Sequence, residues 1–402
     1  MTTFAGINLR PDDGAPGCGA AFVLRNSPYA SRTIRYDEWV IDVVKGAKTV
    51  IARGRSPRTI ERAVEDGLAA ANVGLDLMCF QESERLLIDR YDDEHVSWCP
   101  APAGDGLSVV ATAAHVLELG LGATGTVRDP HGELVPTSSP SSLSWHPSYR
   151  YFRVSQTTTD LHDAYRNAFL ALESLLDHVQ PQEGGGEGAW FAKAMSHADG
   201  LIGHAYKLFP NDRDPVRSTV DEFYRQWRTA VAHSKASRVF ILPHDAEARV
   251  DLLRSLHRLS EYYVTLAKHV LPVGRGSTHF TQYLFRQMAQ SLSQFEVYAS
   301  DDASAIDLED DRLSPAGGAL VAMTPTGDLD ISEPFVAQRA WANHSADLPL
   351  PCIRRVVGGQ NGDAGFALVL EADLVLASGD WFEARFSWST VSRTDLRSRY
   401  AT

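Results

Sequence analysis

Hydrophobic and polar positions alternate in short runs over the first 155 residues of the chain. Clusters of Gly, Pro and Asp separate these runs, which is typical of β-strands. The strand-like runs are Ala20–Leu24, Thr49–Ala52, Leu86–Asp89 and Val109–Val116. One helix is expected among them, with Ser56 as its N-cap and Pro57 at its first position, because residues 60, 64, 68 and 71 are apolar at helical spacing. The pattern predicts a β-rich N-terminal domain with one helix over residues 1–155.

From about residue 158 the hydrophobic period changes from two to 3.6, which indicates amphipathic helices. The expected helices are Asp160–Val179, Ala189–Leu208, Asp214–His233, Asp245–Val270 and Ser277–Tyr298. Each carries one apolar stripe, which includes Phe223, Trp227 and Ala230 in the third helix and Val250 in the fourth. Asp214 is the expected N-cap of the third helix, with Pro215 behind it. Helices with short connections pack as antiparallel neighbours. The pattern therefore predicts an antiparallel helical bundle over residues 156–298.

Strand-like runs return in residues 299–402, which we expect to form a β-rich C-terminal part. These runs are Ala319–Met323, Cys352–Val357, Phe366–Leu376 and Trp381–Trp388. The predicted fold class is α+β, with a central antiparallel helical bundle flanked by β-rich N- and C-terminal parts. The two flanks are either separate units or one sheet around a helical insertion, and both arrangements remain open.

Composition and charge narrow the classes of protein to consider. The net charge of −13 argues against a protein that coats nucleic acid through clustered cations, although cations outnumber carboxylates within residues 190–270. The four cysteines are scattered without a CxxC pair, which favours a reducing compartment. The sequence has no secretory signal and no apolar run of about 18 residues. We expect a cytoplasmic protein with no membrane partner.

Two short motifs suggest cofactor or metal sites, and both are better explained otherwise. Gly120–Gly125 reads GLGATG, but a dinucleotide site requires a helix to start there, whereas a strand-and-turn sequence follows. His197 and His204 lie two helical turns apart, but zinc needs further ligands nearby. We expect neither a cofactor nor a metal.

The remaining motif is Arg228-Thr-Ala-Val-Ala-His233, near the end of the third predicted helix. Together with YRNAFLALESLL (165–176) and YRQWRTAVAHSK (224–235), it resembles the HEPN family (higher eukaryotes and prokaryotes nucleotide-binding domain) over about residues 160–270. The flanks loosely resemble the β-rich parts of ApeA-like and MauJ-like members. The same spacing at Arg90–His95 and Arg339–His344 does not end an amphipathic helix. Thr229 stands where the family often has Asn.

The resemblance implies a helical bundle and a metal-independent endoribonuclease, acting as a toxin or phage-defence effector. In such an enzyme His233 takes the proton from a ribose 2′-hydroxyl, and Arg228 stabilises the charge that develops on the phosphoryl oxygens. Thr229 supports the pair. The resemblance also implies a homodimer through the bundle, with RNA as substrate. DNA is not expected to be cut, because it lacks the 2′-hydroxyl.

Two other interpretations of the same residues stay open. In an α-helix, five residues at about 100° each place the positions of Arg228 and His233 roughly 140° apart around the axis. The two side chains then serve as a salt bridge and a helix C-cap, and the bundle is a non-catalytic dimerisation, RNA-binding or nucleotide-binding scaffold. A small-molecule enzyme in the N-terminal part is the third alternative, but no site for it is visible in the sequence.

Overall fold

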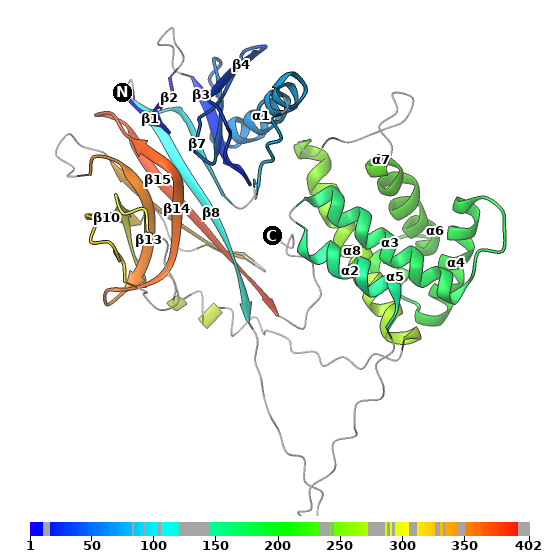
Figure 1. Ribbon diagram of the computed structural model, residues 1–402. Coiled ribbons are helices and arrows are strands. Elements are labelled where there is room, and N and C mark those ends of the chain that lie inside the picture. The colour runs from blue at the N-terminus through cyan, green and yellow to red at the C-terminus, as the bar shows by residue number, and fades with distance from the viewer. Residues whose placement is uncertain are drawn as a thin grey trace, which may run out of the picture. The chain divides into compact units, whose positions relative to one another are not determined.

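A computed structural model provides the fold of most of the chain (Figure 1). The structure describes residues 1–10, 17–82, 84–89, 91, 94–102, 106–119, 145–158, 160–232, 242, 245–271, 286–287, 290–291, 294–304, 312–325, 330–332, 335–343 and 350–392. In this part of the chain, no helix combines the length and the apolar composition that crossing a membrane requires. The GLGATG segment lies outside the described residues.

Strands occupy both ends of the chain and helices occupy its middle. The strands are β1 (Thr3–Phe4), β2 (Ile7–Asn8), β3 (Cys18–Val23), β4 (Arg32–Tyr36), β5 (Trp39–Val43), β6 (Thr49–Gly54), β7 (Glu94–Pro100), β8 (Leu107–Leu119), β9 (Glu296–Ser300), β10 (Leu320–Pro325), β11 (Asp330–Ser332), β12 (Phe335–Asn343), β13 (Ile353–Gln360), β14 (Asp363–Val375) and β15 (Trp381–Ser392). The helices are α1 (Ile60–Glu82), α2 (Pro147–Thr157), α3 (Leu161–Val179), α4 (Glu187–Ile202), α5 (Ala205–Leu208), α6 (Pro215–Val220), the π-helix η1 (Asp221–Arg228), α7 (Thr229–Ala232) and α8 (Ala246–Val270).

The chain divides into two compact units, and the first contains both of its β-rich ends. Unit 1 comprises Met1–Leu117 and Thr281–Ser389, and unit 2 comprises Glu118–Phe280 with Thr390–Thr402. In unit 1, strands from the two ends are hydrogen-bonded neighbours: β1 pairs with β14, and β8 lies beside β15 (Figure 1). The two β-rich flanks are therefore parts of one unit, whose strands pair across the two ends of the chain.

The expected arrangement, a central helical bundle flanked by β-rich parts, is wrong, although the class is α+β. The described strands form a 15-stranded sheet, in which β11 branches off by pairing with β12, and the paired ends of the chain make up the dominant structure. The physical reason is that a strand edge buried in a protein must find a neighbour for its backbone groups. Here the missing neighbours come from the far end of the sequence.

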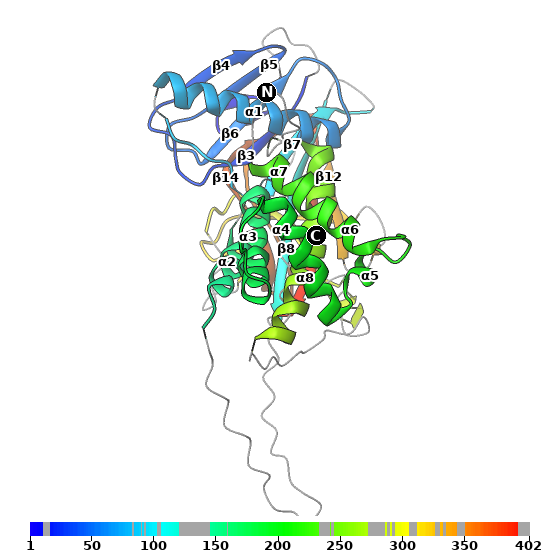
Figure 2. The same cartoon turned by 90° about the vertical axis from the view of Figure 1, so that its right-hand side faces the viewer.

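In the N-terminal part of unit 1, α1 packs against β3 and β6 and covers the apolar face of the sheet (Figure 2). The core includes Phe22, Ile41 and Leu68, all almost fully buried. The expected N-cap of α1 is wrong: the helix begins at Ile60, and the Ser56 hydroxyl instead donates a hydrogen bond to Glu38. Because Glu38, which also pairs with Arg58, accepts the Ser56 hydroxyl proton, Ser56 does not cap the helix.

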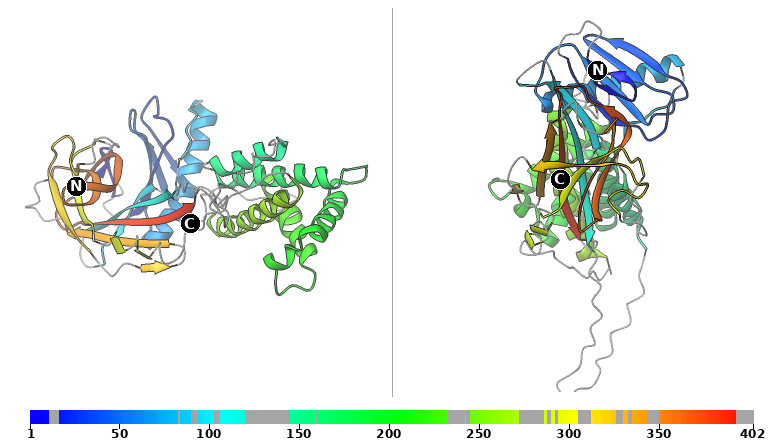
Figure 3. Two further views of the ribbon diagram at one scale, coloured as in Figure 1. Left: turned by 90° about the horizontal axis from the view of Figure 1, so that it is seen from below. Right: turned by 90° about the vertical axis from the view of Figure 1, so that its left-hand side faces the viewer.

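Unit 2 contains a helical bundle (Figure 3), and several of its helices begin where the sequence predicts. Asp160 caps α3 by accepting a hydrogen bond from the Asp163 amide, and Asp245 caps α8 in the same way from the Ala248 amide. The shared core consists of residues at helical spacing, such as Tyr165, Phe169, Leu172, Phe191, Phe223, Leu256 and Leu259. The apolar stripes of the sequence thus face one another in the bundle.

Two details of the predicted bundle are wrong. Val250, assigned to the buried stripe of α8, is exposed, whereas Leu252 is buried. The fifth helix cannot reach Tyr298, because Glu296–Ser300 is strand β9, which pairs with both β10 and β13. The pairing available in the sheet overrides the helical period of this segment.

Candidate functional site

The segment that carries the Arg228 motif is a helix in three consecutive parts, α6, η1 and α7. Figure 1 labels the first and the last of these parts. The helix begins where the sequence predicts. The Asp214 side chain accepts a hydrogen bond from the Arg217 amide at 3.1 Å, and Pro215 occupies the first turn. The middle part, Asp221–Arg228, is a π-helix, a rare form that is frequent at functional sites. Thr229–Ala232 is α-helical again.

The π-helix faces the bundle with its apolar side chains and is held there by a polar contact. Phe223, Trp227 and Ala230 are buried, as the sequence predicts. The buried Tyr165 of α3 donates its hydroxyl proton to the Phe223 carbonyl at 3.2 Å. Burial raises the pKa of Tyr165, so the hydroxyl keeps the proton that it donates. The face opposite to this core is left to polar side chains.

Arg228 lies at the end of η1, with its side chain 26% exposed, and two contacts fix its guanidinium. Nη2 is 2.5 Å from Oε1 of Glu187 at the start of α4. The guanidinium carbon also lies 5.3 Å from the centre of the Tyr224 ring, a distance at which a cation is attracted to the ring face. Tyr224 in turn stacks on Phe191, with 5.2 Å between ring centres. The guanidinium therefore rests on an aromatic platform built by two helices.

A second carboxylate lies close to this ion pair. Glu173 of α3 is half-buried. Burial raises its pKa, the negative charge of Glu187 raises it further, and the positive charge of Arg228 opposes the shift. Glu187 thus pairs directly with the guanidinium, and Glu173 lies close enough to feel both charges. Neither acid stands out in the sequence, because only the fold brings α3, α4 and η1 together.

The other two candidate residues have different positions. The Thr229 hydroxyl donates a hydrogen bond to the Tyr224 carbonyl at 3.1 Å, so it supports the helix backbone and not the Arg228 side chain. His233 lies outside the described residues, which end in this helix at Ala232. The geometry of the site is therefore that of Arg228 and its neighbours.

The two histidines considered for zinc do not share a surface. His197 is exposed, whereas His204 is buried and its Nε2 lies 3.0 Å from Glu261. The backbone amides of His204 and Ala205 donate hydrogen bonds to the Asp199 carboxylate, which caps the turn that follows α4. Within the described ranges, no group of three or more His, Cys, Asp or Glu side chains is placed to hold a metal ion.

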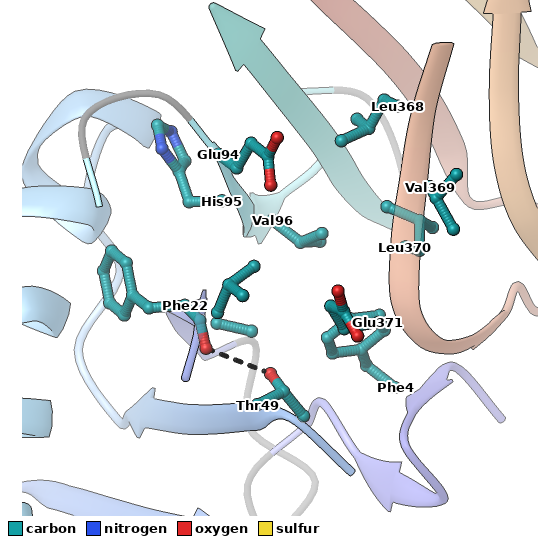
Figure 4. Close-up of a pocket in the computed structure, with 12 residues that line it drawn as sticks. Phe4, Phe22, Thr49, Glu94, His95, Val96, Leu368, Val369, Leu370 and Glu371 are labelled. Carbon is teal, nitrogen blue, oxygen red and sulfur yellow. Dashed lines mark hydrogen bonds between the residues drawn. The ribbon is translucent and has the colours of Figure 1, made fainter. Parts of the chain in front are cut away.

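A small cavity lies in unit 1, between β3 and β7 on one side and β14 on the other (Figure 4). His95 contributes to its lining, together with Phe22, Leu368 and Leu370. Burial lowers the pKa of His95 to about 4, outweighing the hydrogen bond to the Tyr91 carbonyl, so the imidazole is neutral at physiological pH. Thr49, Glu94 and Glu371 also contribute to a lining that is mainly apolar, but the cavity volume of about 20 Å³ has room for little more than one water molecule. We therefore do not treat this cavity as a site.

Comparisons with known proteins assign no family to the chain. No protein-family model matches it, and neither the curated proteins nor the solved structures include a significant match.

Proposed function

We propose that unit 2 is a HEPN-type, metal-independent endoribonuclease in which Arg228 and His233 act together. The observation that carries the proposal is the presentation of Arg228. The motif helix buries Phe223, Trp227 and Ala230 and leaves the guanidinium partly exposed on an aromatic platform. A planar guanidinium held in this way matches a phosphodiester through paired hydrogen bonds.

In the proposed reaction, neutral His233 accepts the proton of a ribose 2′-hydroxyl. The 2′-oxygen forms a bond to the adjacent phosphorus, and the bond from phosphorus to the 5′-oxygen breaks. Arg228 stabilises the negative charge on the phosphoryl oxygens. Protonation of the departing 5′-oxygen, by the imidazolium or by water, completes the step and leaves a 2′,3′-cyclic phosphate.

The proposal includes a setting for this chemistry. The substrate is RNA and not DNA, the active form is a homodimer through the bundle, and the protein acts in the cytoplasm as a toxin or a phage-defence effector. All of these features follow from the resemblance of residues 160–270 to the HEPN family.

A second candidate function is a non-catalytic scaffold that binds RNA or nucleotides, or dimerises, through the same bundle. The ion pair between Arg228 and Glu187 favours it, because a guanidinium already paired with a carboxylate is a normal structural element. The hydrogen bond from Thr229 to the Tyr224 carbonyl favours it too, because it directs the hydroxyl away from Arg228.

The first prediction separates these two functions. Purified protein should cleave a labelled RNA with or without EDTA and should leave DNA of the same sequence intact. His233→Ala should slow cleavage by about 10²–10⁴-fold through loss of proton transfer, and Arg228→Ala by about 10²–10³-fold through loss of charge stabilisation. Arg225→Ala is the matched control, because Arg225 is 62% exposed on the same helix and pairs only with Asp221 among the described contacts.

Thermal melting completes this experiment. Both active-site variants should keep a melting temperature within a few degrees of the wild type. If the wild-type protein never cleaves RNA, and Arg228→Ala lowers the melting temperature strongly, the pair is structural and the scaffold takes its place.

A further inference from the structure

The carboxylate of Glu187 occupies the position on Arg228 that an RNA phosphate would need. Nη2 of Arg228 and Oε1 of Glu187 are 2.5 Å apart, a short charge-assisted contact. A phosphodiester offers the same kind of acceptor, an anionic oxygen that pairs with the guanidinium fork. Carboxylate and phosphate therefore compete for one donor group.

We propose that Glu187 is an autoinhibitory competitor, which an RNA phosphate must displace from Arg228 before cleavage. This inference rests on the function proposed above and concerns the regulation of the same site. It assigns Glu187 a role that requires no contact with the reacting atoms.

Packing around the pair keeps Arg228 in place if Glu187 leaves. Tyr224 contacts both the guanidinium and the ring of Phe191. The first turn of α4 lies against the same tyrosine: a Cβ added at Gly188 would come within 3.0 Å of the Tyr224 ring. The platform under Arg228 is thus supported by contacts that do not involve the Glu187 carboxylate.

The Glu187 side chain can leave Arg228 and turn into solvent. Its side chain is 38% exposed, and it directly follows a glycine stretch in which Gly184 and Gly185 have positive φ angles of 117° and 84°. A Cβ added at either glycine would meet nothing within 4 Å, so little packs against this approach to α4. The carboxylate can therefore turn outward without disturbing the core.

Electrostatics give the displacement its direction. The Glu187 carboxylate that pairs with Arg228 also repels an approaching phosphate, since both are anionic. Removal of the Glu187 charge has two effects: it relieves this repulsion, and it frees the guanidinium to bind the phosphate. Removal of a partly exposed ion pair of this kind should therefore raise the affinity for RNA about fivefold.

The test measures RNA binding and cleavage by the full chain. Binding of a labelled single-stranded RNA is measured by fluorescence anisotropy in the His233→Ala background, so that the probe is not cut. Glu187→Gln should bind about fivefold more tightly, and with His233 restored it should cleave faster at limiting RNA. Glu183→Gln is the matched control, because it removes the same charge from an exposed position four residues away. Adding Arg228→Ala should abolish the gain.

The other outcomes overturn either the inference or the function. Equal RNA affinity of Glu187→Gln and its parent rejects the competitor role, as does an equal gain in Glu183→Gln. If neither protein binds RNA, the proposed function fails, and the inference fails with it. Should Glu187→Gln not fold, Glu187→Asp replaces it: it keeps the charge at the start of α4 but shortens the side chain, and an affinity unchanged from its parent rejects the inference.

Discussion

Two consecutive arginines in β13 lie in opposite environments. The side chains of Arg355 and its partner Asp302 are 0% and 1% exposed, whereas Arg354 and its partner Asp373 are 41% and 50% exposed. Arg355 also donates hydrogen bonds to the carbonyls of Ser304 and Leu313 and so fixes the chain that leaves β9. The two neighbours form a natural comparison of buried and exposed ion pairs.

Asp302→Asn should lower the free energy of unfolding by about 3–5 kcal/mol at pH 7, because it leaves the Arg355 charge buried without a counter-charge. Asp373→Asn should cost less than about 1 kcal/mol, since its pair is exposed. Urea denaturation of both variants measures the difference. Equal losses would mean that the burial of Arg355 does not matter.

The acid dependence of this pair has a definite sign. Burial opposes ionisation of Asp302, but hydrogen bonds from Ser304, Ala316 and Ser314 outweigh it and lower its pKa to about 2. A carboxyl whose pKa is lower in the folded state stabilises the fold above its unfolded pKa of about 4. That contribution, about 2 kcal/mol, should disappear between about pH 4 and pH 2 in the wild type and be absent in Asp302→Asn.

At the residue scale, the sequence predicts which side chains are buried better than it predicts their ion-pair partners. The buried side chains of the motif helix follow from spacing, and so does the partly exposed position of Arg228. The partners Glu187 for Arg228 and Asp302 for Arg355 do not follow, because they are supplied by distant segments. A charged residue in an apolar strand gives no indication of which carboxylate will meet it.

At the scale of elements, the π-helix is the main feature that the sequence does not predict. The sequence from Asp214 to His233 reads as one regular helix because Phe223, Trp227 and Ala230 recur at spacings of four and three, which suit an α-helix equally well. Within this wider turn, the Phe223 carbonyl has a hydrogen-bond partner from outside the helix. This partner is the Tyr165 hydroxyl.

Tyr165→Phe tests this role of the hydroxyl. The variant loses the buried hydrogen bond to the Phe223 carbonyl and the longer contact, 3.5 Å, with the Ser255 hydroxyl. This loss should lower the stability of unit 2 by about 1 kcal/mol, which corresponds to roughly 2–4 °C in melting temperature for a unit of this size. The matched control is Tyr206→Phe, because Tyr206 is 64% exposed. A melting temperature equal to that of the control would show that the contact does not support the π-helix.

At the scale of the whole molecule, the pairing of the two chain ends determines the fold of unit 1. The buried Asp380 accepts a hydrogen bond from the Leu107 amide at 2.8 Å and another from the Thr2 hydroxyl, so one carboxylate joins the start of the chain to its last strands. Strands and helices can be recognised from local periodicity. Their long-range pairing cannot, because alternation identifies a buried face but does not identify the neighbouring strand. For this reason the sequence alone does not decide whether the two flanks are separate units or one sheet.

The last prediction follows from this pairing. A variant in which residues 120–280 are replaced by a flexible linker of about 20 residues, with a reach of roughly 25 Å, should fold and melt cooperatively, because every strand of unit 1 keeps its neighbours. A second variant that ends before Asp380 should not, because it loses β15 with the buried Phe382, Phe386 and Trp388. Removal of each such aromatic side chain costs about 3–5 kcal/mol, and together they match the stability of a typical domain, about 5–15 kcal/mol.

Circular dichroism melting of the two variants measures the contrast. Cooperative melting of the truncated chain, or its absence in the variant without the helices, would show that the ends do not depend on each other as the pairing implies.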